Sequence, residues 1–77
     1  MIPWEISIVR GAERRVAKIS SIGWLVVRWV RTDYEVSVFG VPMDKHSRTM
    51  EDGVARAEFA ARKYVREAME IVREDGP

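Results

Sequence analysis

The sequence contains no cysteine and only one histidine among its 77 residues. Without cysteine the chain forms neither a disulfide framework nor a cysteine-based zinc site, so its stability has to come from packing. A chain of this length buries only about 60% of the surface that its unfolded state exposes, which makes a single core marginal. We therefore expect one domain over residues 1–77, stabilised by a long helix, by tight packing or by a second copy of itself.

Long apolar runs are also missing. No stretch approaches the roughly 18 residues of a membrane span. The first ten residues, MIPWEISIVR, lack the basic start and apolar run of a secretory signal. Together with the absence of cysteine, these features predict a soluble, cytoplasmic protein that does not enter a membrane.

A strong charge of one sign is absent, because 13 basic and 12 acidic residues leave a formal net charge of +1. The charges are unevenly divided. Residues 1–48 carry eight basic and five acidic residues, whereas residues 49–77 carry five basic and seven acidic residues. Neither part is charged strongly enough to identify a nucleic-acid-binding protein by charge alone.

The residues that usually carry catalysis are scarce. His46 lies beside Asp44 in a polar stretch and could in principle take part in acid–base chemistry or bind a metal. A lone histidine among charged loop residues is far more often solvated. The chain also lacks a cysteine nucleophile and a glycine-rich phosphate loop. We predict a protein that is not an enzyme, with no metal site and no cofactor.

Alternating apolar residues predict the first strand, in which Trp4, Ile6 and Ile8 share one face. Residues 12–20 are open to two interpretations. Gly11 could form a tight turn into a second strand, or Ala12, Val16 and Ile19 could form one face of a short helix. A helix of about nine residues is marginal without packing, and a meander needs only short connections. These considerations favour the strand.

The stretch GWLVVRWVRTDYEVSV, residues 23–38, predicts a β-hairpin. A two-residue loop at Thr32-Asp33 would pair Trp29 with Val36, and would set Leu25 opposite Gly40. One face would then carry Leu25, Val27, Trp29, Tyr34, Val36 and Val38, and the other Trp24, Val26, Arg28, Val30, Glu35, Ser37, Phe39 and Val41. Thr-Asp is not a strong hairpin dipeptide, so a three-residue loop that exchanges the two tryptophans remains an alternative.

A polar loop over residues 42–48 leads into a helix over residues 49–74, which begins at Thr49 with Asp52 three residues later. Gly53 is expected to weaken the first turn by roughly 1 kcal/mol relative to alanine. Apolar residues at helical spacing form one stripe that comprises Met50, Val54, Ala57, Ala61, Tyr64, Val65, Ala68, Ile71 and Val72. These elements predict an α+β fold, in which an antiparallel meander of three to four strands over residues 3–41 packs against one long C-terminal helix.

The predicted helix is longer than the predicted sheet. At 1.5 Å per residue it spans about 38 Å, whereas strands of seven residues span about 23 Å. The helix should therefore extend past the sheet by about two turns. Because its apolar stripe continues to the end, something should cover the extension, and we expect a homodimer.

Aromatic residues outside the expected core suggest a surface that binds a protein partner. The candidate surfaces are the second face of the sheet and the outer stripe of the helix. Charged pairs four residues apart would equally suit an ordinary solvated helix face, so Phe59 is the residue that favours an interaction surface. The candidate partner-binding residues are Trp24, Arg28, Phe39, Phe59, Arg62 and Arg66.

A basic cluster, RGAERRVAK, offers an alternative function in nucleic-acid binding, since arginine and lysine contact phosphates. The same residues could simply protect strand edges from aggregation. The candidate nucleic-acid-binding residues are Arg10, Arg14, Arg15, Lys18, Arg28 and Arg31.

The segments GWLVVRWV, YEVSVF and TMEDGVARAEFAARKYVREAM together resemble the architecture of small phage and mobile-element proteins, among them the anti-CRISPR inhibitors. This resemblance implies a compact β-then-α protein that blocks a host nuclease or nucleoprotein complex by binding to it. Many anti-CRISPR proteins are acidic and mimic DNA, which the balanced charge of this chain does not match. The arm-binding domains of phage integrases also look similar, with a three-stranded sheet and a helix that is shorter and more basic.

Overall fold

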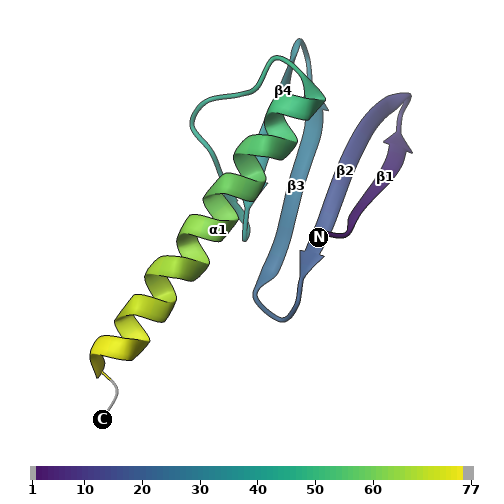
Figure 1. The fold of residues 1–77 in the computed structure, drawn as a ribbon. Helices are drawn as coiled ribbons and strands as arrows, with labels where there is room; N and C mark the ends of the chain where they lie inside the picture. The colour runs from purple at the N-terminus through teal and green to yellow at the C-terminus, as the bar shows by residue number, and fades with distance from the viewer. Residues whose placement is uncertain (1, 76–77) are drawn as a thin grey trace.

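The computed structural model describes residues 2–75, and for residues 71–75 it describes the backbone alone (Figure 1). An antiparallel sheet follows chain order and comprises β1 (Trp4–Val9), β2 (Ala12–Ile19), β3 (Gly23–Val30), β4 (Asp33–Val38) and β5 (Val41–Pro42). Helix α1 (Met50–Asp75) comes after the sheet. The predicted α+β meander is confirmed. The sheet has five strands instead of three to four, because a turn at Phe39-Gly40 brings two more residues back to pair with β4.

The segment over residues 12–20 forms a strand, and the short-helix alternative is wrong. Strand β2 pairs with β1 on one side and with β3 on the other, so both sets of its backbone groups are used. The turn that starts it has positive φ angles at Arg10 and Gly11, 53° and 79°. Two consecutive residues in this conformation match the twist of the flanking strands, as in a type I′ hairpin turn.

The β3–β4 hairpin keeps the predicted faces but not the predicted pairing. Trp29 pairs with Tyr34 and Leu25 pairs with Val38, so the loop is Arg31-Thr32 and the register is displaced by two residues. A displacement of two leaves the side chains of the paired residues 25–30 and 33–38 on their predicted faces, because faces alternate with a period of two. Gly40 is not available to pair with Leu25, because it adopts φ 84° in the β4–β5 turn.

The core lies between α1 and the middle of the sheet. Its buried residues are Ala17, Leu25, Val27 and Val36 from the strands and Met50, Ala57 and Ala61 from the helix. Gly53 allows the close approach of the two layers, since a Cβ atom there would lie 2.7 Å from Val27 Cγ1. The sequence indicated only that this glycine lowers helix stability, whereas the structure shows that Val27 leaves no room for a larger side chain.

Polar contacts hold the start of the helix in place. Thr49 Oγ1 accepts a hydrogen bond of 3.1 Å from the Asp52 N–H, which is the expected N-cap contact. The preceding loop is tied to the sheet because the main chains of Ser47 and Tyr34 exchange two hydrogen bonds, of 2.8 and 2.9 Å. Arg56 Nη1 donates to Ser47 Oγ at 2.8 Å and thereby links the loop to the helix.

Beyond Ala61 the helix diverges from the sheet (Figure 1), and Tyr64 still packs against Phe39. Tyr64, Ala68 and Met69 are exposed, and the molecule measures 52 × 22 × 18 Å. The predicted extension of the helix is therefore present. The side chains of Ile71 and Val72, which complete the predicted stripe, lie outside the described residues. No helix within residues 2–75 is long and apolar enough to cross a membrane.

Candidate functional site: an apolar groove beside the helix

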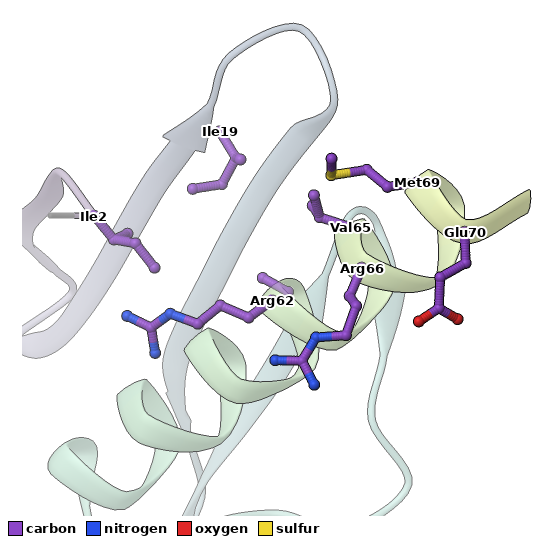
Figure 2. A pocket seen from close by; sticks show the side chains of 8 residues that line it. Ile2, Ile19, Arg62, Val65, Arg66, Met69 and Glu70 are labelled. Carbon is purple, nitrogen blue, oxygen red and sulfur yellow. The ribbon is translucent and has the colours of Figure 1, made fainter. Parts of the chain in front are cut away.

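A groove of about 480 Å³ opens where α1 diverges from the end of β2 (Figure 2). We call it the apolar groove. Its described walls are mainly aliphatic, and three charged side chains stand at its rim. The lining residues are Ile2, Ile19, Ala61, Val65 and Met69, with Arg62, Arg66 and Glu70 at the rim.

Helical spacing accounts for one wall of the apolar groove. Ala61, Val65 and Met69 are each four residues apart, so they stack along one side of the helix. Figure 2 shows Val65 and Met69 on the side that faces Ile19, the last residue of β2. The groove exists because the helix and the strand separate at an angle, so that Met69 stays 56% exposed instead of entering the core.

A carboxylate links the rim of the apolar groove to the first strand. Glu58 Oε2 accepts a hydrogen bond of 2.7 Å from Trp4 Nε1. The other oxygen of Glu58 lies 3.3 Å from Arg62 Nη2, in an ion pair of residues four apart along the helix. These contacts hold β1, the helix and the rim arginine together, so the wall of the groove is preorganised on rigid elements.

The face of the sheet opposite the helix, which we call the outer face, carries the outward tryptophan. Trp24 is 50% exposed on this face, and Lys18 Nζ lies 5.8 Å from its ring centroid. Arg28 forms an ion pair with Glu35 on the neighbouring strand, with a nitrogen–oxygen distance of 2.9 Å. Among residues 2–75, no helix or loop packs across this face.

The sequence-based placement of Phe39 on the outer face with Trp24 and Arg28 is wrong. Its ring packs against Tyr64 of the helix, with ring centroids 5.1 Å apart, and it is half-buried beside the core. The reason is a positive φ of 53° at Phe39, which ends the strand and breaks the alternation of faces. Phe39 therefore helps to hold the helix on the sheet.

The remaining partner-binding candidates are divided among separate surfaces. Trp24 and Arg28 lie on the outer face, Arg62 and Arg66 at the rim of the apolar groove, and Phe59 is 71% exposed on the helix. Phe59 does not line the groove. The other tryptophan, Trp29, lies on the helix side of the sheet, where its ring packs edge-on against Tyr34 at 5.1 Å.

Five of the six basic candidates lie on the outer face or in the turns of the sheet, spread along its length, and one does not. Arg14, Lys18 and Arg28 project from the outer face, whereas Arg10 and Arg31 occupy turns at the same end of the sheet. Including Arg15 in this cluster is wrong. Its register places it on the helix side, opposite Val27, where its Nε lies 2.6 Å from Glu13 Oε2.

The single histidine has an ordinary setting. His46 Nδ1 lies 3.9 Å from Asp33 Oδ2, not beside the Asp44 carboxylate that its sequence position suggested. In residues 2–75 there is no group of three histidine, aspartate or glutamate side chains arranged as a metal site requires.

Sequence reasoning missed the aliphatic lining of the apolar groove. Val65 was assigned to the core stripe, Ile19 to a doubtful segment, and Ile2 and Met69 to no site. The available signal was the excess length of the helix over the sheet. That signal shows that part of the helix is uncovered, but not which strand residues stand beside it.

Comparisons with known proteins identified no relative of this chain. No family model matches the chain, and neither curated proteins nor solved structures give a match.

Proposed function

We propose that this protein is a non-enzymatic protein-binding module that holds an apolar, acid-flanked segment of its partner in the apolar groove. Within that class, the more specific proposal is an inhibitor of phage or mobile-element type that acts on a host nucleoprotein complex in the cytoplasm. The observation that carries the class is the apolar groove itself, with Val65 and Met69 on a helix that extends past the sheet.

The amount of apolar surface supports a protein ligand. Contiguous apolar patches are uncommon on small monomeric proteins and usually mark binding sites. Here Met69 is 56% exposed and lines the same groove as Ile2 and Ile19, so the patch is formed by three separate segments of the chain. A partner side chain or helix that entered this space would remove aliphatic surface from water on both sides.

The rim indicates the charge of the partner. Arg62 and Arg66 stand on one side of the apolar groove, and among the side chains that the structure describes Glu70 is the only acidic one that lines it. The side chain of Arg62 is 65% exposed even though it pairs with Glu58, so its charge reaches the solvent. Acidic residues next to an apolar anchor would therefore be attracted to this rim and would orient the segment.

The proposal includes the expected homodimer, but the two copies need not contact each other through the apolar groove. The excess length of the helix was the reason to expect a second copy. The structure places the groove beside that length, so a different partner can occupy it while a second copy binds elsewhere.

A peptide experiment tests the groove. Amphipathic helical peptides with one apolar face and either acidic or basic flanks are titrated into isotope-labelled protein. Chemical shifts are followed by NMR. The acidic-flanked peptide should shift the resonances of Ile19, Val65 and Met69, and Met69→Lys should reduce its affinity at least tenfold. Phe59→Lys is the matched control, because it changes an exposed apolar residue outside the groove and should leave affinity within about twofold.

Two outcomes would refute the groove proposal. One is equal binding of acidic- and basic-flanked peptides, which would remove the charge argument. The other is a set of shifts confined to the outer face of the sheet. Folding of each variant is checked by circular dichroism, so that a loss of binding is not confused with a loss of structure.

A second candidate function, nucleic-acid binding, is favoured by the outer face. Lys18 lies beside the exposed Trp24 there, Arg14 and Arg28 lie opposite each other four residues further along the strands, and the turn residues Arg10 and Arg31 lie at that end of the sheet. Basic side chains contact phosphates, and an aromatic ring on an open sheet can stack on a base. However, Glu35 pairs with Arg28 and lowers the local positive charge.

A labelled single-stranded oligonucleotide distinguishes this candidate from the first. Nucleic-acid binding should weaken steeply with salt, and both Arg14→Ala and Trp24→Ala should reduce it. Arg15→Ala is the matched control, because that arginine lies on the other side of the sheet. Absence of binding at low salt would eliminate the second candidate and leave the groove proposal untouched.

A further inference from the structure

The two edges of the sheet differ in how far they are protected. The β5 edge has two residues, and one of them is Pro42, which has no N–H to offer another strand. The β1 edge runs for six residues, WEISIV, without lysine or proline. Natural proteins usually protect an edge of this kind with short length, charge or proline. The β1 edge has none of these protections, apart from the single charge of Glu5.

Every second residue of β1 presents its backbone to the open edge. Val9 and Ala12 flank the two-residue turn, so they form the hydrogen-bonded pair that closes the hairpin. Alternation then turns the backbone groups of Trp4, Ile6 and Ile8 away from β2. In agreement, the N–H of Trp4 does not pair with β2 but donates to the carbonyl of Ile2 at 3.0 Å.

The side chains of the same three residues form an apolar row that is uncovered at Ile6 and Ile8. Trp4, Ile6 and Ile8 lie on the helix side of the sheet. The main helix–sheet contacts are with β3 and β4, and the helix reaches this row only at Trp4, which is partly buried and donates a hydrogen bond to Glu58. Ile6 is 63% exposed and Ile8 is 66% exposed. A strand that paired with β1 would therefore meet both open backbone groups and exposed aliphatic side chains.

We infer that the occupant of the β1 edge is the β1 strand of a second copy, paired antiparallel about a two-fold axis at Ile6. In this register Ile6 lies opposite Ile6 of the other copy, Trp4 opposite its Ile8, and Glu5 opposite its Ser7. The backbone groups that point toward the other copy belong to the Ile6–Ile6 and Trp4–Ile8 pairs. Each Ile6 and each Ile8 donates one N–H to the other copy, while each Trp4 N–H stays with Ile2.

The register is self-complementary, which is the reason to choose a second copy over an unrelated strand. The apolar row of each copy continues into that of the other on the same side of the joined sheet, because a two-fold axis perpendicular to the sheet keeps its faces aligned. No like charges meet, since Glu5 lies opposite serine. Head-to-tail growth through β5 is blocked by Pro42, so the assembly closes as a dimer.

The dimer leaves the proposed function of the apolar groove independent. The helix packs mainly on β3 and β4 and the groove opens at the end of β2, so pairing along residues 4–8 leaves both grooves open and one dimer could hold two partner segments. Failure of the dimer would not affect the peptide experiment on the groove, and failure of the groove would not affect the dimer.

Sedimentation and cross-linking test the pairing. The protein should sediment as a dimer, near twice 8.9 kDa, at micromolar to millimolar concentration. Ile6→Cys should form an intermolecular disulfide on mild oxidation, because Cα atoms in such a pair are about 5.5 Å apart, within disulfide range. Ser7→Cys should not, because the two sulfur-bearing residues would be offset along the strands and about 8 Å apart. The chain has no other cysteine to interfere.

Ile6→Lys is the variant that should disrupt the dimer. It places two ammonium groups opposite each other at the axis and should shift the protein to monomer at concentrations where the parent is dimeric. Val41→Lys, an equally exposed residue on the β5 edge, should leave the dimer intact. A monomer at all concentrations, a dimer unaffected by Ile6→Lys, or faster cross-linking of Ser7→Cys than of Ile6→Cys would overturn the inference.

Discussion

The two halves of helix α1 share one apolar spacing but have different surroundings. In the first half Met50, Ala57 and Ala61 are buried against the sheet, and Gly53 lies almost in contact with Val27. In the second half Ala68 and Met69 are exposed, although the apolar spacing continues. The same apolar spacing therefore forms part of the core in one half and one wall of the apolar groove in the other. The difference is whether a strand lies underneath.

The largest expected effect comes from placing the same side chain in both halves. Ala57→Gln should destabilise the fold by about 3 kcal/mol, because a long polar side chain enters a position that is fully buried against β3 and β4. Ala68→Gln should change the free energy of unfolding by less than about 0.5 kcal/mol, since the position is exposed and glutamine is a good helix former. Urea denaturation followed by circular dichroism measures both. Equal losses would mean that the second half is covered in solution.

Gly53→Ala tests the close contact in the first half. Alanine should favour the helix by roughly 1 kcal/mol, yet the net effect should be a loss of about 1–2 kcal/mol because the new methyl group meets Val27 at 2.7 Å. The loss should be smaller in a Val27→Ala background, which removes the clashing atom. Thermal unfolding of the two single variants and the double variant gives the coupling energy. A stabilising Gly53→Ala would contradict the observed spacing.

Thr49→Ala tests the start of the helix. It removes the oxygen that caps the Asp52 N–H and should cost about 1 kcal/mol. Thr32→Ala is the control, because Thr32 is an exposed threonine in the β3–β4 turn and should contribute less than about 0.5 kcal/mol. Chemical denaturation distinguishes them, and a helix that tolerates both changes equally would show that the cap does not limit stability.

Glu58→Gln should have the smallest effect. Glu58 lies towards the end of the first half of the helix, where it bonds to Trp4 of β1. The amide oxygen can still accept the hydrogen bond from Trp4, and only the exposed ion pair with Arg62 is lost. The expected cost is below about 0.5 kcal/mol. Glu58→Ala removes both contacts and should cost about 1 kcal/mol more. If Glu58→Gln proved as costly as Glu58→Ala, the ion pair would matter more than the link to β1.

Most of the architecture could be predicted from local patterns. Alternation in WEISIV and GWLVVRWV predicted strands, and spacing from Met50 onward predicted the helix and its cap at Thr49. The predicted faces of the paired hairpin residues are correct although the predicted register is displaced by two residues. A displacement by any even number of residues keeps each side chain on the same face. Each pattern is repeated over several residues of its segment, so an error at one residue does not change the predicted element.

The site depended on details that local patterns do not contain. Phe39 left its predicted face because of one backbone angle at a turn, and Arg15 left the basic cluster because β2 is a strand with alternating faces. The apolar groove needs Ile2, Ile19 and Met69 to come together from three parts of the chain. No spacing rule connects residues so far apart.

The amino-acid sequence by itself determined the order of the elements, the faces of the central hairpin and the excess length of the helix, since each follows from periodicity along one segment. It also showed that Trp24 and Trp29 point to opposite sides of the sheet. Only the tertiary structure decided which apolar residues are covered. Coverage depends on the angle at which the helix crosses the strands and on which strand ends at the edge. Both result from packing between distant segments.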